Sequence, residues 1–165
     1  MDTLTQYQNA NDLYFKQVTR QFDVAFTWIL VWLVVLGAVF FAQDHLFTTQ
    51  LFAIKPQKIE GLIGILTAPL LHGSIEHLAG NAFSLLILGL IAGSFYPRAS
   101  IRALPIIWLG SGFGTWFVSL GGNHIGASGV TVGIMFFLIA QGIKRRDRSS
   151  TTALLIALFM FGGMV

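Results

Sequence analysis

The sequence has 165 residues, of which 55% are hydrophobic and only 10% are charged. A soluble domain usually carries about 25% charged residues, so this composition excludes an ordinary soluble protein and favours an integral, multi-pass membrane protein. The absence of cysteine excludes disulfide bonds, thiolate metal sites and a cysteine nucleophile. The net charge is +3, but the basic residues stand at the ends of apolar runs, which is typical of membrane topology and not of a nucleic-acid-binding surface.

The first apolar run covers residues 24–42 and is long enough to cross a bilayer. It predicts a membrane anchor and not a cleavable signal peptide, because the residues before it are polar and mixed in charge. We therefore expect residues 1–23 to form a cytosolic N-terminal segment and residues 24–165 to form the membrane domain. A connection follows over residues 43–71, and its apolar part, residues 61–71, is too short to span and fits an interfacial or re-entrant loop.

Three further apolar runs predict helices over residues 75–95, 101–120 and 126–143. A last run, residues 151–165, would reach about 22 Å against a hydrocarbon core of about 30 Å, so it predicts a helix that is cut short. We therefore expect a sequence that is truncated at its C-terminus. The predicted fold class is all-α, a polytopic helix bundle with four full transmembrane helices and a truncated fifth.

Basic residues predict the orientation of this bundle, because cytoplasmic loops are enriched in lysine and arginine. Basic residues precede the first helix, separate the second from the third, and follow the fourth: Lys16 and Arg20, Arg98 and Arg102, and residues 144–148. We expect these regions, and the N-terminus, to be cytoplasmic, in a bacterial inner membrane. The second and fourth helices then begin at the outer face, where Lys55 and Lys58 are a mild exception to the rule.

Polar residues gather at these two outer helix starts. His77 and Asn81 are four residues apart, so they share one helix face. In hydrocarbon such side chains are costly unless they face a partner or a water-filled cavity. Ser128 opens the fourth helix, where unpaired N–H groups and the positive end of the helix dipole favour an anion. The combination predicts a serine nucleophile whose oxyanion is held by a backbone N–H and by the side chains of His77 and Asn81.

Small residues surround this serine. Gly126 and Gly129 would let neighbouring helices and a substrate backbone approach closely. Gly129 also pairs with Gly133, and Gly110 pairs with Gly114 on the preceding helix. Both G-x-x-x-G pairs are more typical of plain helix packing than of a functional site.

His72 stands five residues before His77, an angle of about 140° on a helix. We therefore expect His72 in the loop before the helix, where it braces that loop. The two histidines do not fit either order of the zinc-protease motif H-E-x-x-H, because one metal ion could not reach both from a helix. We expect no metal site and no nucleotide or other cofactor.

At these motifs the chain resembles the rhomboid family of intramembrane serine proteases. Residues 72–81 are similar to the family's second-helix motif, and residues 126–129 are similar to its nucleophile motif. The predicted helices over residues 24–143 match the family's first four in order, so the membrane domain is expected to be rhomboid-like. The resemblance implies a six-helix core, a Ser–His dyad, and cleavage of transmembrane segments of membrane proteins near the outer face.

The resemblance also implies a role for each site residue. Ser128 would be the nucleophile, His77 and Asn81 the oxyanion-hole donors, and His72 a structural histidine. Gly126 would be a structural residue beside the nucleophile, and so would Gly129. The expected partners are the lipid bilayer and transmembrane protein substrates, and not nucleic acid. The sequence makes no prediction about oligomeric state.

One part of the family's machinery has no counterpart here. The family's base is a histidine on its sixth helix, and no histidine follows Ser128 in this sequence. A serine hydroxyl needs a base to act as a nucleophile, so we expect this chain to be nearly inactive as a protease. His124, in the outer loop, is the nearest substitute, and His45 at the outer end of the first helix is farther away.

Two other functions remain as alternatives. The missing base favours a rhomboid-like pseudoprotease that binds transmembrane clients without cleaving them, although such a binder would not need oxyanion donors. A small transporter would require charged residues deep in the bundle. None is evident within the helices predicted over residues 24–42, 101–120 and 126–143.

Overall fold

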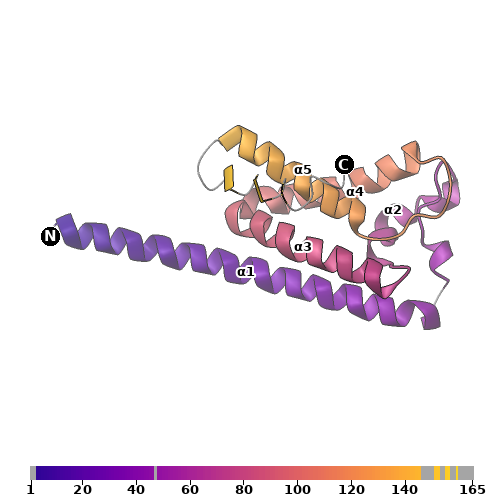
Figure 1. Ribbon diagram of the computed structural model, residues 1–165, viewed down its shortest axis with the longest axis horizontal. Helices are drawn as coiled ribbons and strands as arrows, with labels where there is room; N and C mark the ends of the chain where they lie inside the picture. The colour runs from indigo at the N-terminus through magenta and orange to yellow at the C-terminus, as the bar shows by residue number, and fades with distance from the viewer. Residues whose placement is uncertain (1–2, 47, 146–150, 153–154, 157–158, 160–165) are drawn as a thin grey trace.

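The structure is a computed structural model that describes residues 3–46, 48–145, 151–152, 155–156 and 159 (Figure 1). Over these residues it is helical and contains no strand, which confirms the predicted all-α class. The four long helices are α1 (Thr3–Leu46), α3 (Ile75–Phe95), α4 (Pro97–Val118) and α5 (Ser128–Arg145). Short helical turns join α1 to α3: η1 (Thr49–Leu51), η2 (Ile59–Gly61), α2 (Gly64–Thr67) and η3 (Ala68–Leu70).

Three helices are long and apolar enough to cross a membrane: Gln6–Gln43 within α1, α3, and α4. The fourth helix, α5, has 18 residues, but it ends in Lys144 and Arg145, which lower its mean hydropathy. It is therefore not among the three candidate spans. The sequence predicted four full spans, and three of them are supported in this way. The fifth predicted helix, residues 151–165, lies largely outside the described residues.

The first helix is much longer than predicted. The expected start was residue 24, but α1 begins at Thr3 and its N-terminal half extends beyond the other helices (Figure 1). Neither glycine nor proline occurs before Gly37, so no strong helix breaker interrupts the backbone between the polar segment and the apolar run. The polar residues therefore continue the membrane helix and do not form a structurally separate segment.

The helix boundary after α3 also differs from the prediction. α3 covers Ile75–Phe95 as predicted, but α4 begins at Pro97, four residues earlier than expected. Proline is well suited to a first helical position, because its fixed φ matches the helix and its missing N–H would be unpaired there anyway. Arg98 and Arg102 consequently lie in the first turns of α4 and not in a connection. Pro105 lies in the helix interior.

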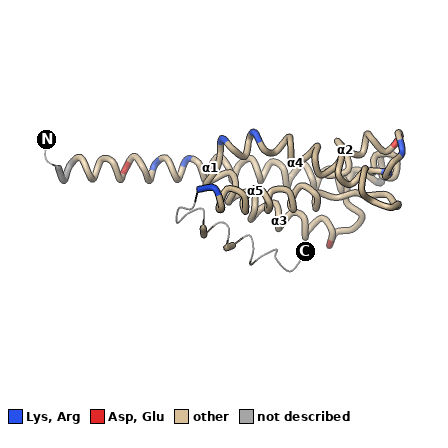
Figure 2. The backbone as a smooth tube through the Cα atoms, turned by 90° about the horizontal axis from the view of Figure 1, so that it is seen from above, with Lys and Arg blue, Asp and Glu red and all other residues tan. Residues whose placement is uncertain are grey.

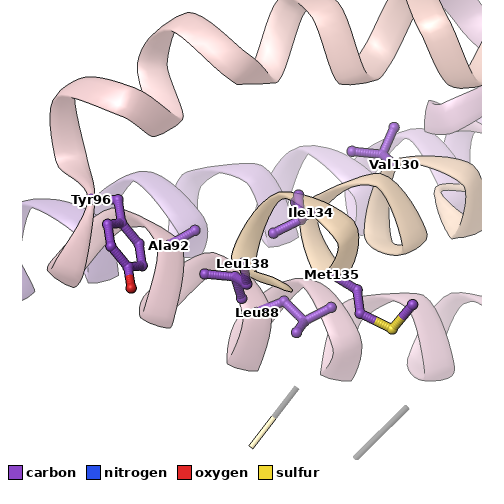
Figure 3. Close-up of a cluster of buried hydrophobic side chains, with 7 residues drawn as sticks. All are labelled: Leu88, Ala92, Tyr96, Val130, Ile134, Met135 and Leu138. Carbon is purple, nitrogen blue, oxygen red and sulfur yellow. The ribbon is translucent and has the colours of Figure 1, made fainter. Parts of the chain in front are cut away.

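A cluster of buried apolar side chains lies between α3 and α5 (Figure 3). Its buried side chains are Leu88, Ala92, Tyr96, Val130, Ile134, Met135 and Leu138. At the end of this cluster the Tyr96 ring meets Phe137 edge-on, with 6.1 Å between ring centroids, and carries the Arg145 guanidinium 4.9 Å above its own centroid. Because lipid tails are as apolar as these side chains, close van der Waals packing is what holds such helices together.

One of the two predicted glycine pairs packs against a neighbour. A Cβ on Gly133 would overlap the Ile107 side chain of α4, and Gly129 lies close to the same helix. The other pair, Gly110 and Gly114, has no described atom within 4 Å of where a Cβ would stand. The packing interpretation is therefore confirmed for the α5 pair alone.

The connection predicted over residues 43–71 contains several short helical turns and is hydrogen-bonded to α4. Its apolar part, Ile59–Leu70, is too short to span, as expected. The Trp108 indole donates to the Leu66 carbonyl at 3.3 Å, and the Trp116 indole donates to the Lys58 carbonyl at 2.9 Å. These bonds hold the segment along α4, and the chain then continues to His72 in the loop before α3.

Charged residues lie at the two ends of the bundle and along the N-terminal half of α1 (Figure 2). The middle of the helices is free of them in the region that the structure describes. This distribution is the one expected of helices that cross a bilayer, because a charge in the hydrocarbon core is expensive.

Candidate functional site

The first turn of α3 brings two of the predicted site residues together. Ser74 caps the helix and accepts a hydrogen bond from the His77 N–H at 3.2 Å. One turn later the Asn81 side-chain amide donates to the His77 carbonyl at 3.1 Å. Asn81 is buried and His77 is partly buried. The two side chains therefore share one face of α3, and the Asn81 side chain is oriented by the helix backbone.

His72 lies in the loop between η3 and α3 and is completely buried. Its ring meets the His77 ring edge-on, with 5.1 Å between the centroids and 67° between the planes. Burial, and secondarily the neighbouring His77, lowers the pKa of His72 below its ordinary value of 6.5. His72 is thus a neutral ring that packs directly against a predicted oxyanion donor.

Gln43, in the last turn of α1, holds this loop in place. Its side-chain amide donates to the His72 carbonyl at 2.6 Å, and its carbonyl oxygen accepts from the His72 N–H at 3.3 Å. Gln43 is only 3% exposed. The sequence analysis did not identify Gln43. An amide side chain directly after the apolar run of α1 was nevertheless a signal that this side chain has a buried partner.

The loop before α5 meets the polar face of α3 at Gly126. Its φ is +109°, a conformation that side-chain-bearing residues rarely adopt, and its N–H donates to the Ala68 carbonyl at 2.8 Å. A Cβ at this position would stand 2.5 Å from Nε2 of His77 and 3.4 Å from Nδ2 of Asn81. The Gly126 backbone therefore lies directly against the polar atoms of both side chains, and only glycine leaves room for them.

Ser128 follows two residues later as the first residue of α5, and it is exposed. The first N–H groups of a helix have no acceptor within the helix, so the backbone at this position can donate to an anion. Thr131 fixes the turn, because its hydroxyl donates to the Ser128 carbonyl at 2.8 Å. The predicted nucleophile, the two predicted side-chain donors and the first N–H groups of α5 thus lie at the same end of the bundle.

A cavity of about 110 Å³ opens beside Ser128, between α4, α5 and the segment that ends at Pro69. Ser111 and Thr115 of α4 are polar members of its lining. Gly129 borders it closely, since a Cβ there would stand 3.3 Å from the Ser111 hydroxyl oxygen. Ser111 was not singled out in the sequence, because a lone serine within an apolar helix carries no distinctive pattern.

His124 lines the same cavity, but its polar groups have other partners. Its backbone forms an isolated antiparallel bridge with Ile54, through bonds of 3.0 and 2.9 Å. Its ring Nε2 lies 2.9 Å from the Gly121 carbonyl oxygen in the same loop. This contact directs the ring toward its own loop, which weakens the interpretation of His124 as a substitute base. His45 lies in the last turn of α1 and is exposed.

Metal ligation has no support in the part of the chain that the structure describes, where no group of three or more histidine, aspartate or glutamate side chains could hold an ion. The predicted site residues at this end of the bundle offer a hydroxyl and hydrogen-bond donors. Such a set can stabilise a developing oxyanion.

Comparison with known proteins identifies the family of the chain. A family model described as the Rhomboid domain matches residues 60–165. Uncharacterized proteins of Mycobacterium bovis and Mycobacterium tuberculosis are each 36% identical over 118 residues, which cover 68% of this chain and 49% of theirs. An uncharacterized protein of Mycobacterium leprae is 30% identical over 118 residues, covering 68% of this chain and 47% of its own. The chain therefore spans about half the length of the curated relatives that it matches, and no solved structure matches it.

Proposed function

Because this chain belongs to the rhomboid family of membrane proteins, we propose that it carries the nucleophile and the oxyanion-hole donors of an intramembrane serine endopeptidase. The observation that supports this most directly is the position of Gly126, whose backbone lies against His77 and Asn81 two residues before Ser128. A plain helix-packing serine would not require two polar side chains and a positive-φ glycine beside it. The substrates would be transmembrane segments of membrane proteins, cleaved near the outer face of the bilayer.

The proposed reaction begins at the Ser128 hydroxyl. Its oxygen attacks the carbonyl carbon of the scissile peptide bond, and its proton passes to a base. The resulting oxyanion accepts hydrogen bonds from His77, from Asn81 and from a backbone N–H at the start of α5, and each such donor is typically worth about 2.7–4 kcal/mol in the transition state. Collapse of this intermediate releases the amine and leaves an ester on Ser128, which water then hydrolyses.

The base is not assigned by this proposal. No histidine follows Ser128 among these 165 residues, and the His124 ring is directed toward the Gly121 carbonyl. The proposal therefore gives this chain the nucleophile and the oxyanion donors only.

Labelling with a fluorophosphonate tests the proposal, because this probe forms a phosphonyl ester with a nucleophilic serine. Labelling of membranes that contain the chain should be weak, because no base is assigned, and it should depend on Ser128: Ser128→Ala should abolish the label, and the control Ser119→Ala should retain it. Asn81→Ala, compared at equal protein abundance, should slow labelling by roughly a hundredfold, the typical effect of losing one oxyanion donor. Labelling that survives in Ser128→Ala would refute the assignment of the nucleophile.

The alternative function, a pseudoprotease that binds transmembrane clients without cleaving them, makes different predictions. This function predicts no labelling of the unmodified chain. It also predicts that a transmembrane client co-purifies equally well with the unmodified chain and with Ser128→Ala. An endopeptidase would instead retain its uncleaved substrate better after Ser128→Ala.

A further inference from the structure

A second cavity, with a volume of about 220 Å³, lies away from Ser128. Its lining comes from two loops: Lys55, Pro56 and Lys58 from the segment after α1, and Gly121, Gly122 and Asn123 from the loop between α4 and α5. Two of these six residues are cationic and none is anionic. The cavity therefore has the charge of an anion-binding site.

The two lysines are held by a rigid turn. The Lys58 N–H donates to the Lys55 carbonyl at 3.3 Å, and the Gln57 N–H between them donates to the Trp116 carbonyl of α4 at 3.0 Å. The Trp116 indole donates in turn to the Lys58 carbonyl at 2.9 Å. Gly61 packs directly against this turn, because a Cβ on Gly61 would overlap the Lys55 backbone. Both lysine backbones are thus fixed at the rim of the cavity.

This turn contains an unusual backbone conformation. Gln57 has a φ of +59°, and in the described residues no other non-glycine residue has a positive φ. Such conformations persist only where the surrounding contacts enforce them, and they are concentrated at ligand-binding and other functional positions. Here the conformation places Lys55 and Lys58 on the same cavity.

Neither lysine is neutralised by the protein. Glu60 is the only acidic residue between Thr48 and Leu71, and within the described structure it forms no ion pair with Lys55 or Lys58. On the opposite wall the backbone is open, because no described atom lies within 4 Å of where a Cβ of Gly121 or Gly122 would stand. A ligand could therefore approach this backbone closely while it meets two ammonium groups.

We propose that this cavity binds a phosphate ester, namely the headgroup phosphate of an anionic phospholipid. The cavity lies beyond the C-terminal end of α4, one of the candidate membrane spans, so a lipid headgroup at that end of the helix could reach it. Its volume is below the roughly 300–1,000 Å³ of sites for drug-sized ligands, so it suits a group as small as a headgroup. Lysines near a membrane surface attract anionic lipids, which explains why this pair departs from the charge pattern of the other loops.

Native mass spectrometry of the full chain tests this proposal by counting lipids that remain bound after mild delipidation. The chain should retain phosphatidylglycerol in preference to phosphatidylcholine. The double variant Lys55→Gln, Lys58→Gln should weaken phosphatidylglycerol binding by roughly thirtyfold, as expected for the loss of two surface lysines. Lys55→Arg with Lys58→Arg keeps the charge and should keep the binding.

The matched control is Arg98→Gln with Arg102→Gln, which removes the same charge from exposed positions at the start of α4. Equal losses in the two glutamine variants would overturn the proposal, because binding would then depend on net charge and not on the cavity. Unchanged binding in Lys55→Gln, Lys58→Gln would overturn it as well. Inorganic phosphate is the second probe, because it tests whether the site binds free phosphate and not a lipid. Lysine-dependent binding of phosphate without binding of phosphatidylglycerol would overturn the assignment to a lipid.

Discussion

Gly126 is the residue at which the candidate site tolerates the least change. Its φ of +109° disfavours any side chain, and a Cβ would stand 2.5 Å from the His77 ring nitrogen. We expect Gly126→Ala to destabilise the fold by about 1–3 kcal/mol from backbone strain alone. We also expect it to displace His77 and so to suppress fluorophosphonate labelling of Ser128.

Thermal unfolding in detergent measures the first effect. The matched control is Gly110→Ala, because no described atom lies within 4 Å of its Cβ position and its helical backbone accepts alanine. Gly110→Ala should be neutral or stabilising by up to about 1 kcal/mol. Equal melting temperatures for the two variants would contradict the close approach seen at Gly126.

His72 should make the stability of the chain depend on pH. Burial lowers the pKa of His72 below its ordinary 6.5, so at acidic pH the folded state binds fewer protons at this ring than the unfolded state does. Its contribution to stability is therefore complete above about pH 6.5 and is lost as the pH falls from there toward the lower folded pKa. The melting temperature should decrease over this window, and His72→Asn should reduce the decrease.

Exposed His45 provides the comparison for this effect. His45→Asn should leave the pH dependence of the melting temperature unchanged. If His72→Asn retained the full dependence, the titrating group would lie elsewhere in the protein.

Contacts between residues that are close in the sequence could be predicted, and contacts between residues that are far apart in the sequence could not. The i, i+4 spacing of His77 and Asn81 placed both on one face of α3, where the structure has them. Gln43 was missed because its partner, His72, lies 29 residues away along the chain. The contact of Gly126 with the His77 ring depends on the docking of two helices, and no sequence period reports that geometry.

At the scale of elements, the helix boundaries that carried a local signal were predicted best. α3 starts after the capping residue Ser74 and covers the predicted residues 75–95. The start of α1 was wrong by about twenty residues, because hydropathy marks where a helix becomes apolar and not where its backbone becomes helical. Hydropathy also placed the start of α4 after its actual first residue, Pro97, which is the better signal.

The contact between α4 and α5 should depend on the small size of Gly133. A side chain at Gly133 would overlap Ile107, so Gly133→Leu should push α5 away from α4 and destabilise the chain by about 1–3 kcal/mol, the usual effect of overpacking. Gly114→Leu is the matched control, since it adds the same side chain where no described atom lies within 4 Å. Thermal unfolding of both variants measures the difference, and a larger loss in Gly114→Leu would contradict the packing described.

At the scale of the whole molecule, the packing of α3 against α5 determines the geometry of the candidate site. The cluster between these helices runs from Tyr96 at one end to Val130, two residues after Ser128, at the other. Because α3 and α5 are rigid, their contact along this cluster sets the separation of the two helix starts that carry His77 and Ser128. The loop between α4 and α5 connects the candidate site with the lysine-lined cavity. It contributes Gly126 to the site and Gly121 to the cavity.

The orientation of the bundle provides the last prediction. The basic residues at the start of α4 and the end of α5 lie at the opposite end from Ser128, and the positive-inside rule assigns that end to the cytoplasm. The N-terminal part of α1 extends from the same end (Figure 1).

Since the chain has no cysteine, single introduced cysteines can report the orientation of the bundle directly. We expect Leu120→Cys, which is fully exposed after α4, to react with a membrane-impermeant maleimide in intact cells, and Gln8→Cys to react only after permeabilisation. The reverse pattern would place Ser128 at the cytoplasmic face, where the proposed cleavage would act on the inner ends of substrate helices.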